Sequence, residues 1–522
     1  MDITVPATTP QPDAKVWLAV IGSIIGAFIA VLNIQITNAS LPDIQGAIGA
    51  GIDDGGWIST SYLVAEIVVI PLTGFLAPVF SLRRYLLANT VMFLVMSVAC
   101  AFAGNLEQMI VLRALQGFFG GVLIPLAFTI TLTMLPRDKQ PVGLAMFAVS
   151  ATFAPAIGPT IGGYLTDTYS WKYIFYVNLV PGVIMLAMLL PSLPRAPMQL
   201  RRLVHGDWPG IATLAIGLAS LQTVLEEGNK DDWFGSPLIV RLSLVSAVAL
   251  SLFIWIELTT EQPLLNLRLL LRRNFGLGSI SNVILGMALY GSVYLLPSYL
   301  SRTQGYNAQQ VGEVLAWTGL PQLLIIPFVP RLMRQFDARL LVAIGLGLFA
   351  ASCFMNIDIN PDYSGPQLLW PNLVRAAGQA LVLTPLSVLA TGGIEREQAG
   401  SASALFNMMR NLGGSIGIAM LETLLTKREQ YHSAIINPSV SLFNDATRRR
   451  LDDLQRYFMS TGTADPAQAW HDAVVAVGRS VQAQAYYLAF GDTFFLMGSA
   501  LLLAVVAAVL MRRSEGSGAG AH

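Results

Sequence analysis

Apolar stretches long enough to cross a lipid bilayer recur along almost the whole chain. A membrane-spanning helix needs about 20 mostly apolar residues, and we count fourteen such stretches. Only 12% of the residues are charged, which is about half the share found in soluble domains. We therefore expect an all-α polytopic membrane protein. The expected spans are 16–38, 56–77, 85–104, 108–134, 142–165, 173–191, 208–227, 238–258, 276–299, 310–329, 339–357, 367–391, 400–425 and 486–511.

Basic residues gather on alternate connections between these spans. Connections of this kind face the cytoplasm in membrane proteins, so we expect both termini there, with 1–15 and 512–522 as tails. The long connection 427–486 then lies outside the cytoplasm. Its mixed charge suggests helices that lie on the membrane or on a partner protein, and a solvated loop is the alternative. The basic residues of the cytoplasmic side include Lys15, Arg83, Arg84, Arg137, Lys139, Arg195, Arg272, Arg273, Arg512 and Arg513.

The order of motifs in the first six spans is repeated in the last six. Residues 112–117 of the fourth span precede Pro125, and the similar residues 374–379 of the twelfth span precede Pro385. Two six-helix halves around a central cavity are typical of transporters in which one half rocks against the other. The expected parts are an N-terminal half at 16–191, two inserted helices at 208–258 and a C-terminal half at 276–511.

The fifth span is unusually rich in glycine and proline. Small residues four positions apart let a neighbouring helix approach closely in a bilayer, and each proline disturbs a backbone hydrogen bond, so the helix is expected to bend. We interpret this span as a deformable helix, and a tight packing seam is the simpler alternative. One stripe consists of Ala154, Gly158 and Gly162, and the adjacent stripe consists of Pro155, Pro159 and Gly163.

Two charged residues lie deep inside expected spans of the first half. A charge at the centre of a bilayer costs at least about 2.5–3.5 kcal/mol, so it rarely has no function. Glu66 is the only acid in the middle of the first six spans, and Arg113 lies in the fourth span. We expect Glu66 to bind and release the transported proton, with Arg113 competing with that proton. A structural pair between the two side chains is the alternative.

Other polar, aromatic and methionine residues in the spans are candidates for a substrate cavity, although helix packing or lipid contact would also explain them. Three further acids, Glu226, Glu227 and Glu422, lie near span ends, where solvation is an easy explanation. No metal-ligand spacing or nucleophile–base pattern is found, so we expect no metal, no cofactor and no enzyme activity, and the zero net charge argues against nucleic acid as a partner. The cavity candidates are Asn33, Gln35, Asn38, Gln116, Tyr290, Tyr294, Arg375, Met408 and Arg410.

Several of these motifs resemble those of one transporter family. Residues 154–163 resemble the antiporter motif of the major facilitator superfamily, and residues 112–117 resemble its fourth-span arginine motif. With fourteen spans, the chain is similar to the drug:proton antiporters of that superfamily, and within them to EmrB-type multidrug efflux pumps. The narrower resemblance comes from residues 32–42, 171–178, 232–234 and 407–417.

The resemblance implies a major facilitator fold and proton-driven export of small amphipathic compounds by alternating access in the bacterial inner membrane. In Gram-negative relatives it also implies a periplasmic adaptor and an outer-membrane channel as partners. A dedicated exporter of one natural product, such as a siderophore, is an alternative. A membrane scaffold without transport is another, although it would not need Glu66, Arg113 or the glycine–proline helix.

The chain departs from the family pattern at two places. Relatives usually carry an aspartate where this chain has Asn33, so the expected proton-binding group moves to Glu66. In the connection after the second span, Pro78 and Ser81 replace an aspartate and a glycine of the family motif. The resemblance therefore does not carry a charge-based latch over to this connection.

Overall fold

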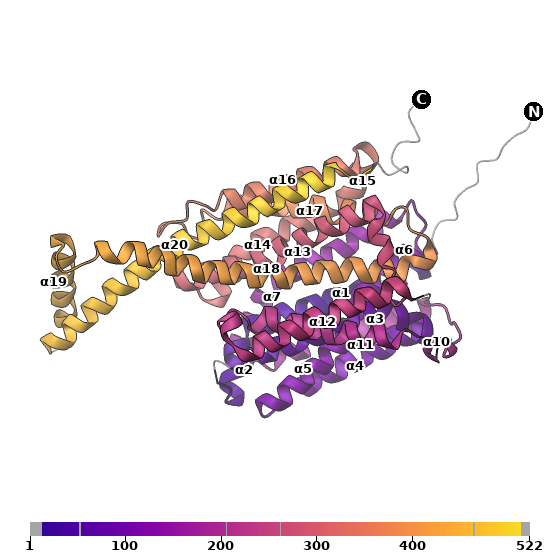
Figure 1. Ribbon diagram of the computed structural model, residues 1–522, viewed down its shortest axis with the longest axis horizontal. Helices are drawn as coiled ribbons and strands as arrows, with labels where there is room; N and C mark the ends of the chain where they lie inside the picture. Colours follow the sequence, from indigo (N-terminus) through magenta and orange to yellow (C-terminus); the bar gives the residue numbers. More distant parts are fainter. Residues whose placement is uncertain (1–12, 52–53, 205, 261–262, 463–464, 513–522) are drawn as a thin grey trace, which may run out of the picture.

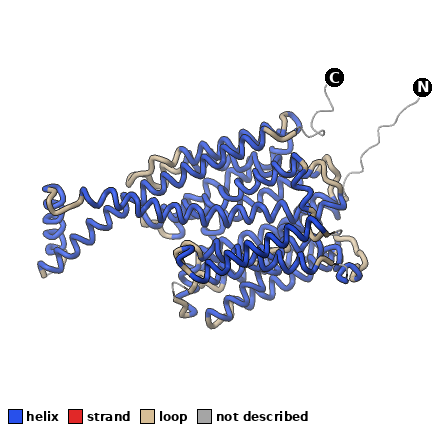
Figure 2. The backbone as a smooth tube through the Cα atoms, in the orientation of Figure 1, coloured by secondary structure: helices blue, strands red, loops and turns tan. Residues whose placement is uncertain are grey.

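The computed structural model describes residues 13–51, 54–204, 206–260, 263–462 and 465–512. Residues 1–12 and 513–522 lie outside these ranges, and they make up most of the two expected tails, 1–15 and 512–522. The described residues form helices joined by loops, and they contain no strand (Figure 2). The prediction of an all-α fold is therefore confirmed.

The N-terminal half contains one helix for most of the expected spans, but two spans are divided. Residues 108–134 form two helices because Pro125 has no N–H to donate to the Gly121 carbonyl one turn earlier. Pro181 has the same relation to Val177 in the sixth span. The helices are α1 (Ala14–Ala39), α2 (Leu41–Ile48), α3 (Trp57–Phe80), α4 (Leu82–Cys100), α5 (Leu106–Gly120), α6 (Leu123–Met134), α7 (Gln140–Thr168), α8 (Tyr173–Tyr176) and α9 (Leu179–Ser192).

The inserted helices and the C-terminal half follow the same plan, with one more divided span where Pro327 and Pro330 interrupt the backbone hydrogen bonds. The elements are α10 (Arg201–Val204), α11 (Trp208–Glu227), η1 (Trp233–Gly235), α12 (Pro237–Thr259), η2 (Leu267–Leu271), α13 (Arg273–Gln304), α14 (Ala308–Ile325), η3 (Ile326–Phe328), α15 (Val329–Gln335), α16 (Ala338–Phe354), α17 (Leu369–Thr391), η4 (Arg396–Gln398), α18 (Ala399–Ile436), η5 (Asn437–Ser439), α19 (Asp445–Ser460) and α20 (Pro466–Val509).

Twelve helical stretches in the described part of the chain are long and apolar enough to cross a membrane. The other two expected spans also lie in helices, but α16 has only 17 residues, and polar side chains such as Asn407 and Arg410 interrupt the apolar sequence of α18. The multi-pass membrane protein is thus confirmed, and fourteen crossings remain an expectation.

The helices gather into two groups that face each other along one long interface (Figure 1). Helix α7 of the first group packs against α14 and α17 of the second, and α18 packs against α3 and α6. The inserted helices α11 and α12 pair with each other, and α11 also packs against both α3 and α18. The inserted pair is therefore part of the junction between the groups.

Helices α18 and α20 continue well beyond the bundle, and α19 packs on the projecting part of α20 (Figure 1). The long connection 427–486 consists largely of these three helices, which stand away from the bundle instead of lying along it. Where the projection begins, Asp492 of α20 accepts hydrogen bonds from Arg428 Nε at 2.6 Å and bonds His432 Nε2 at 2.7 Å. These contacts join α18 to α20.

Candidate functional site

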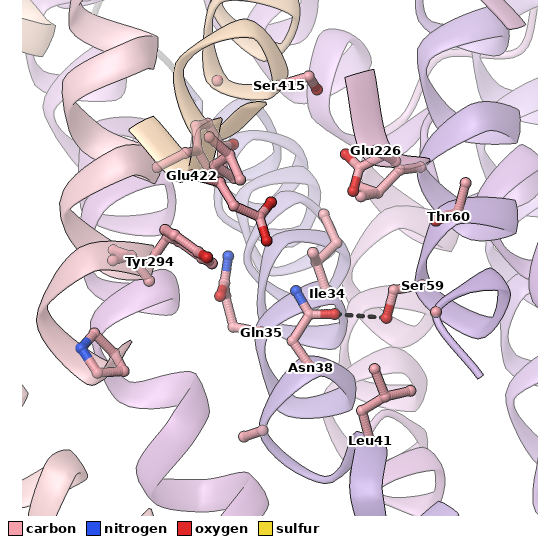
Figure 3. Close-up of a pocket in the computed structure, with 18 of the residues that line it drawn as sticks. Ile34, Gln35, Asn38, Leu41, Ser59, Thr60, Glu226, Tyr294, Ser415 and Glu422 are labelled. Atoms are coloured by element: carbon pink, nitrogen blue, oxygen red, sulfur yellow. Dashed lines mark hydrogen bonds between the residues drawn. The ribbon is translucent and has the colours of Figure 1, made fainter. Parts of the chain in front are cut away.

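A cavity of about 610 Å³ lies between the two groups of helices. Its wall comes from α1, α2, α3, α7, α11, α13, α14 and α18, together with the loops before α3 and after α11 (Figure 3). The last turns of α1 and the first turns of α3 contribute, so the cavity lies toward the end of the bundle from which α18 and α20 project. A volume of this size suits a drug-sized molecule, since small-molecule sites occupy about 300–1,000 Å³.

The opposite end of the bundle is closed by contacts between the groups. The Ser403 hydroxyl of α18 donates to the Pro125 carbonyl of α6 at 2.8 Å. A Cβ added to Gly74 of α3 would lie 3.3 Å from the Gly400 carbonyl of α18, so the two backbones approach closely there. The structure therefore has an internal cavity toward one end and a packed seam toward the other.

Five of the residues predicted to bind substrate or protons line this cavity. Asn38 is one of them, and it accepts a hydrogen bond from the Ser59 hydroxyl at 2.6 Å (Figure 3). Glu66 is only 3% exposed, and its Oε1 has no hydrogen-bond partner among the described residues. The five lining residues are Gln35, Asn38, Glu66, Tyr290 and Tyr294.

Arg113 is not paired with Glu66, because neutral groups hold its guanidinium. Nη1 donates to the Asn33 and Gln116 side-chain oxygens, both at 2.7 Å, and Nε donates to the Ile58 carbonyl at 3.2 Å. No ion pair joins Arg113 to an acid in the described part of the chain. Asn33 and Gln116 were expected to face substrate, but they lie outside the cavity wall because they bind this arginine.

Three other predicted cavity residues also lie elsewhere. Arg375 donates to the Thr318 hydroxyl and lines a separate small cavity. Arg410 donates to the Asn407 side-chain oxygen at 3.0 Å and lies over the Phe147 ring. Met408 is 8% exposed and belongs to the hydrophobic core. None of these three residues lines the large cavity in this structure, and a role for them in substrate binding stays a prediction.

The acids at the span ends were expected to be solvated, but they line the cavity. Glu227 accepts a hydrogen bond from the Thr60 hydroxyl at 2.8 Å and pairs with Lys230 at 3.3 Å. Glu226 accepts a hydrogen bond from Gln222 Nε2 at 2.8 Å. Glu422 lies beside the Tyr294 ring of α13. Sequence reasoning named these acids but favoured solvation for them, because they lie near span ends and the packing of α11 against α3 and α18 cannot be read from the chain. The adjacent acids one turn after Gln222 were the available signal.

The glycine–proline helix α7 forms two close seams. A Cβ on Gly158 would lie 2.4 Å from the Gln35 Cβ of α1, and one on Gly162 would lie 2.9 Å from the Ile36 carbonyl. On its other side, a Cβ on Gly312 of α14 would lie 2.3 Å from the Thr160 hydroxyl. Helix α7 therefore binds its own half and the opposite half at short distance. Of the other two residues of the motif, Pro159 lines the cavity and Gly163 is buried.

The sequence profile of the Major Facilitator Superfamily matches residues 23–418. The chain belongs to the major facilitator superfamily. It is 32% identical to the colistin resistance protein EmrB of Acinetobacter baumannii, over 97% of this chain and 98% of that protein. It is 31% identical to the multidrug export protein EmrB of Escherichia coli, over 98% and 99% of the two chains. It is also 29% identical to the fatty acid resistance protein FarB of Neisseria gonorrhoeae, over 95% of this chain and 96% of that protein.

Solved structures of the major facilitator superfamily share the fold. The human organic anion transporter MFSD10 aligns with a TM-score of 0.56 at 16% identity, over 94% of this chain and all of that one. The proton:xylose symporter XylE aligns with a TM-score of 0.57 at 13% identity, over 95% of each chain. The predicted resemblance to EmrB-type proteins is therefore confirmed, and the chain is a membrane transporter of the major facilitator superfamily.

Proposed function

We propose that this protein exports small amphipathic compounds across the bacterial inner membrane in exchange for protons. The central support is a cavity of about 610 Å³ between the two groups of helices, whose wall contains Glu66 with no hydrogen-bond partner for its Oε1 among the described residues. Relatives that match nearly the full length are named for multidrug export and for colistin and fatty acid resistance. An export substrate with an apolar part agrees with the cavity wall, which includes Ile34, Leu63 and Val293.

Glu66 is the proposed proton carrier. Glu66 is as buried as the residues of the hydrophobic core, and it lines the cavity. It forms no ion pair in the described part of the chain. Arg113 supplies positive charge nearby but remains bound to Asn33 and Gln116. A carboxyl that no contacting cation keeps ionised is free to gain and lose a proton as its access to water changes. The positive charge of Arg113 would oppose protonation of Glu66 without a direct contact between them.

Alternating access would use the seams between the two groups of helices. The contact of α18 with α6 closes one end, where Ser403 bonds the Pro125 carbonyl, and α7 meets α14 at Thr160 and Gly312. Rocking would open the first contact and tighten the packing around the cavity. With the termini in the cytoplasm, as the basic connections predict, the cavity faces the periplasmic side in this conformation.

The proposed pump works with a periplasmic adaptor and an outer-membrane channel. Helices α18, α19 and α20 project from the bundle at the end that would lie in the periplasm (Figure 1). A projecting helical structure offers a surface that a bilayer does not cover. Export through two membranes then starts from the cavity beside the base of this projection.

The deciding experiment measures proton release from inside-out vesicles that hold an imposed pH gradient. On addition of a lipophilic compound, wild-type protein should dissipate the gradient, and Glu66→Gln should not. The matched control is Glu257→Gln, because Glu257 is also 3% exposed but lies outside the cavity wall. Equal responses of wild type and Glu66→Gln would exclude Glu66 as the proton site. No response of wild type to a broad panel would favour an exporter of a single natural product.

A further inference from the structure

The cavity wall contains more acidic than basic side chains. Its described residues include the acids Glu66, Glu226, Glu227 and Glu422 and the bases Lys230 and Arg302. We propose that Glu226 of α11 and Glu422 of α18 bind the protonated amine of an amphipathic substrate. This inference rests on the proposed export function and adds to it a substrate class, amphiphiles that carry an N–H ammonium group.

Of the two acids at the C-terminal end of α11, Glu226 and Glu227, only Glu227 has a basic partner among the described residues. Lys230 and the Thr60 hydroxyl both bind Glu227. Neither Glu226 nor Glu422 forms an ion pair in the described part of the chain. The remaining base of the wall, Arg302, has its Cζ 6.0 Å from the centre of the Tyr486 ring, and its positive charge acts on Glu422 without an ion pair between them among the described residues.

Glu226 lies close enough to two other acids of the wall to feel their charge. Glu227 and Glu422 both disfavour a negative charge on Glu226, because like charges repel strongly where little water is present. Figure 3 shows both carboxyls turned toward the same opening, Glu226 on the α11 side and Glu422 on the α18 side. A cation between them, or a proton on one of them, removes that repulsion.

Unpartnered hydrogen-bond acceptors in the same wall indicate which cation fits. Gln222 is 2% exposed, and its Nε2 donates to both Glu226 and the Ser415 hydroxyl, which leaves its Oε1 without a donor. Glu66 Oε1 and Asn411 Oδ1 also lack a donor among the described residues. All three residues line the cavity. Buried acceptors without a donor are costly, and an ammonium group with N–H bonds supplies charge and donors together.

The rest of the wall accommodates the apolar part of such a molecule. Ile67, Val293 and Ile418 contribute aliphatic surface, and Tyr290 and Tyr294 contribute aromatic surface. A quaternary ammonium has the charge without N–H donors, and a neutral amide has a donor without the charge. The arrangement therefore predicts a graded preference in which the N–H ammonium binds best.

The test measures direct binding to the full-length protein in lipid nanodiscs, without any proton gradient. The probes are three dansyl-labelled alkyl chains that end in a primary ammonium, a trimethylammonium or an N-acetylated amine. Fluorescence anisotropy should show the primary ammonium binding at least about tenfold more tightly than the acetylated probe, with the trimethylammonium in between. Glu226→Gln and Glu422→Gln should each weaken ammonium binding by about tenfold and leave the acetylated probe unchanged. Glu257→Gln should match wild type.

The comparison of probes on wild-type protein keeps the test decisive even if a variant fails to fold. Equal binding of the ammonium and acetylated probes, or no binding of either, would overturn the amine site. Binding with the predicted preference but without proton release in vesicles would contradict the proposed antiport and leave the amine site standing. Proton release driven equally by all three probes would support antiport and overturn the amine site.

Discussion

The Arg113 guanidinium donates to the side-chain oxygen of Asn33 at 2.7 Å, although the two residues are 80 positions apart. The family resemblance implies an aspartate at the Asn33 position in relatives, where the same contact would be an ion pair. The neutral amide of Asn33 leaves the arginine charge without an acid in contact, and Glu66 Oε1 has no hydrogen-bond partner among the described residues. The unusual pairing of Arg113 thus bears directly on how Glu66 would function.

Replacement of Arg113 by lysine is expected to destabilise the fold. A lysine ammonium cannot reproduce the fork that reaches Asn33, Gln116 and the Ile58 carbonyl. Each acceptor left unpaired inside the bundle costs about 1–3 kcal/mol. Thermal unfolding in detergent should show a clear drop in midpoint for Arg113→Lys. The exposed Arg449→Lys in α19 should show none, and equal midpoints would contradict the role of this network.

Return of an acid to position 33 is expected to rescue the proton site. In the Glu66→Gln background, Asn33→Asp places a carboxyl where Arg113 already donates. Proton release from vesicles should recover in part in the double variant. Asn33→Gln in the same background keeps the position neutral and should remain inactive. Recovery with glutamine as well would show that charge at position 33 is not the cause.

An added methyl group on the seam between α7 and α14 is expected to slow transport. The Cβ of Gly312→Ala would lie 2.3 Å from the Thr160 hydroxyl, so the helices must separate. Overpacking of this kind costs about 1–3 kcal/mol. The cost destabilises the conformation in which α7 and α14 are in contact at this seam. Export rates in vesicles should fall for Gly312→Ala and not for Gly347→Ala, whose Cβ meets nothing within 4 Å.

The contacts at the base of the projection are expected to hold α18 and α20 together locally. Asp492→Asn removes the charge that attracts Arg428 and His432. A half-exposed ion pair contributes only about 0–1 kcal/mol, so the unfolding midpoint should hardly change. Hydrogen exchange in α19 and the projecting turns should nevertheless become faster than in wild type. Unchanged exchange would show that the α19–α20 packing holds the projection without this ion pair.

The projection itself is expected to matter for export from the cell but not for transport by the pump. Replacement of residues 441–465 by a short Gly/Ser linker removes α19 and leaves the bundle helices intact. Proton release from vesicles should continue, while drug resistance of intact Gram-negative cells should be lost. Loss of both activities would place the projection in the transport cycle. Retention of both would argue against a periplasmic adaptor on this surface.

The positions of the helices and the family were predictable from the chain alone. Runs of about 20 apolar residues and helical spacing of small residues are local patterns, so α1, α3 and α7 lie where the sequence places them. The burial of Glu66 was predictable for the same reason, because an acid in the middle of an apolar span has no other surroundings. The divided spans were missed, although Pro125 and Pro181 mark them.

The partners of these groups depend on tertiary packing. Arg113 lies nearer to Asn33 and Gln116 than to Glu66 because three helices meet at that point. The acids Glu226 and Glu422 share a cavity because α11 packs against α3 and α18. In sequence, Gln222 and Ser415 are 193 positions apart, yet they are hydrogen-bonded. Hydropathy by itself determined which segments enter the membrane, since it acts on each segment separately. The fold decided which side chains face one another, since that depends on how the segments pack.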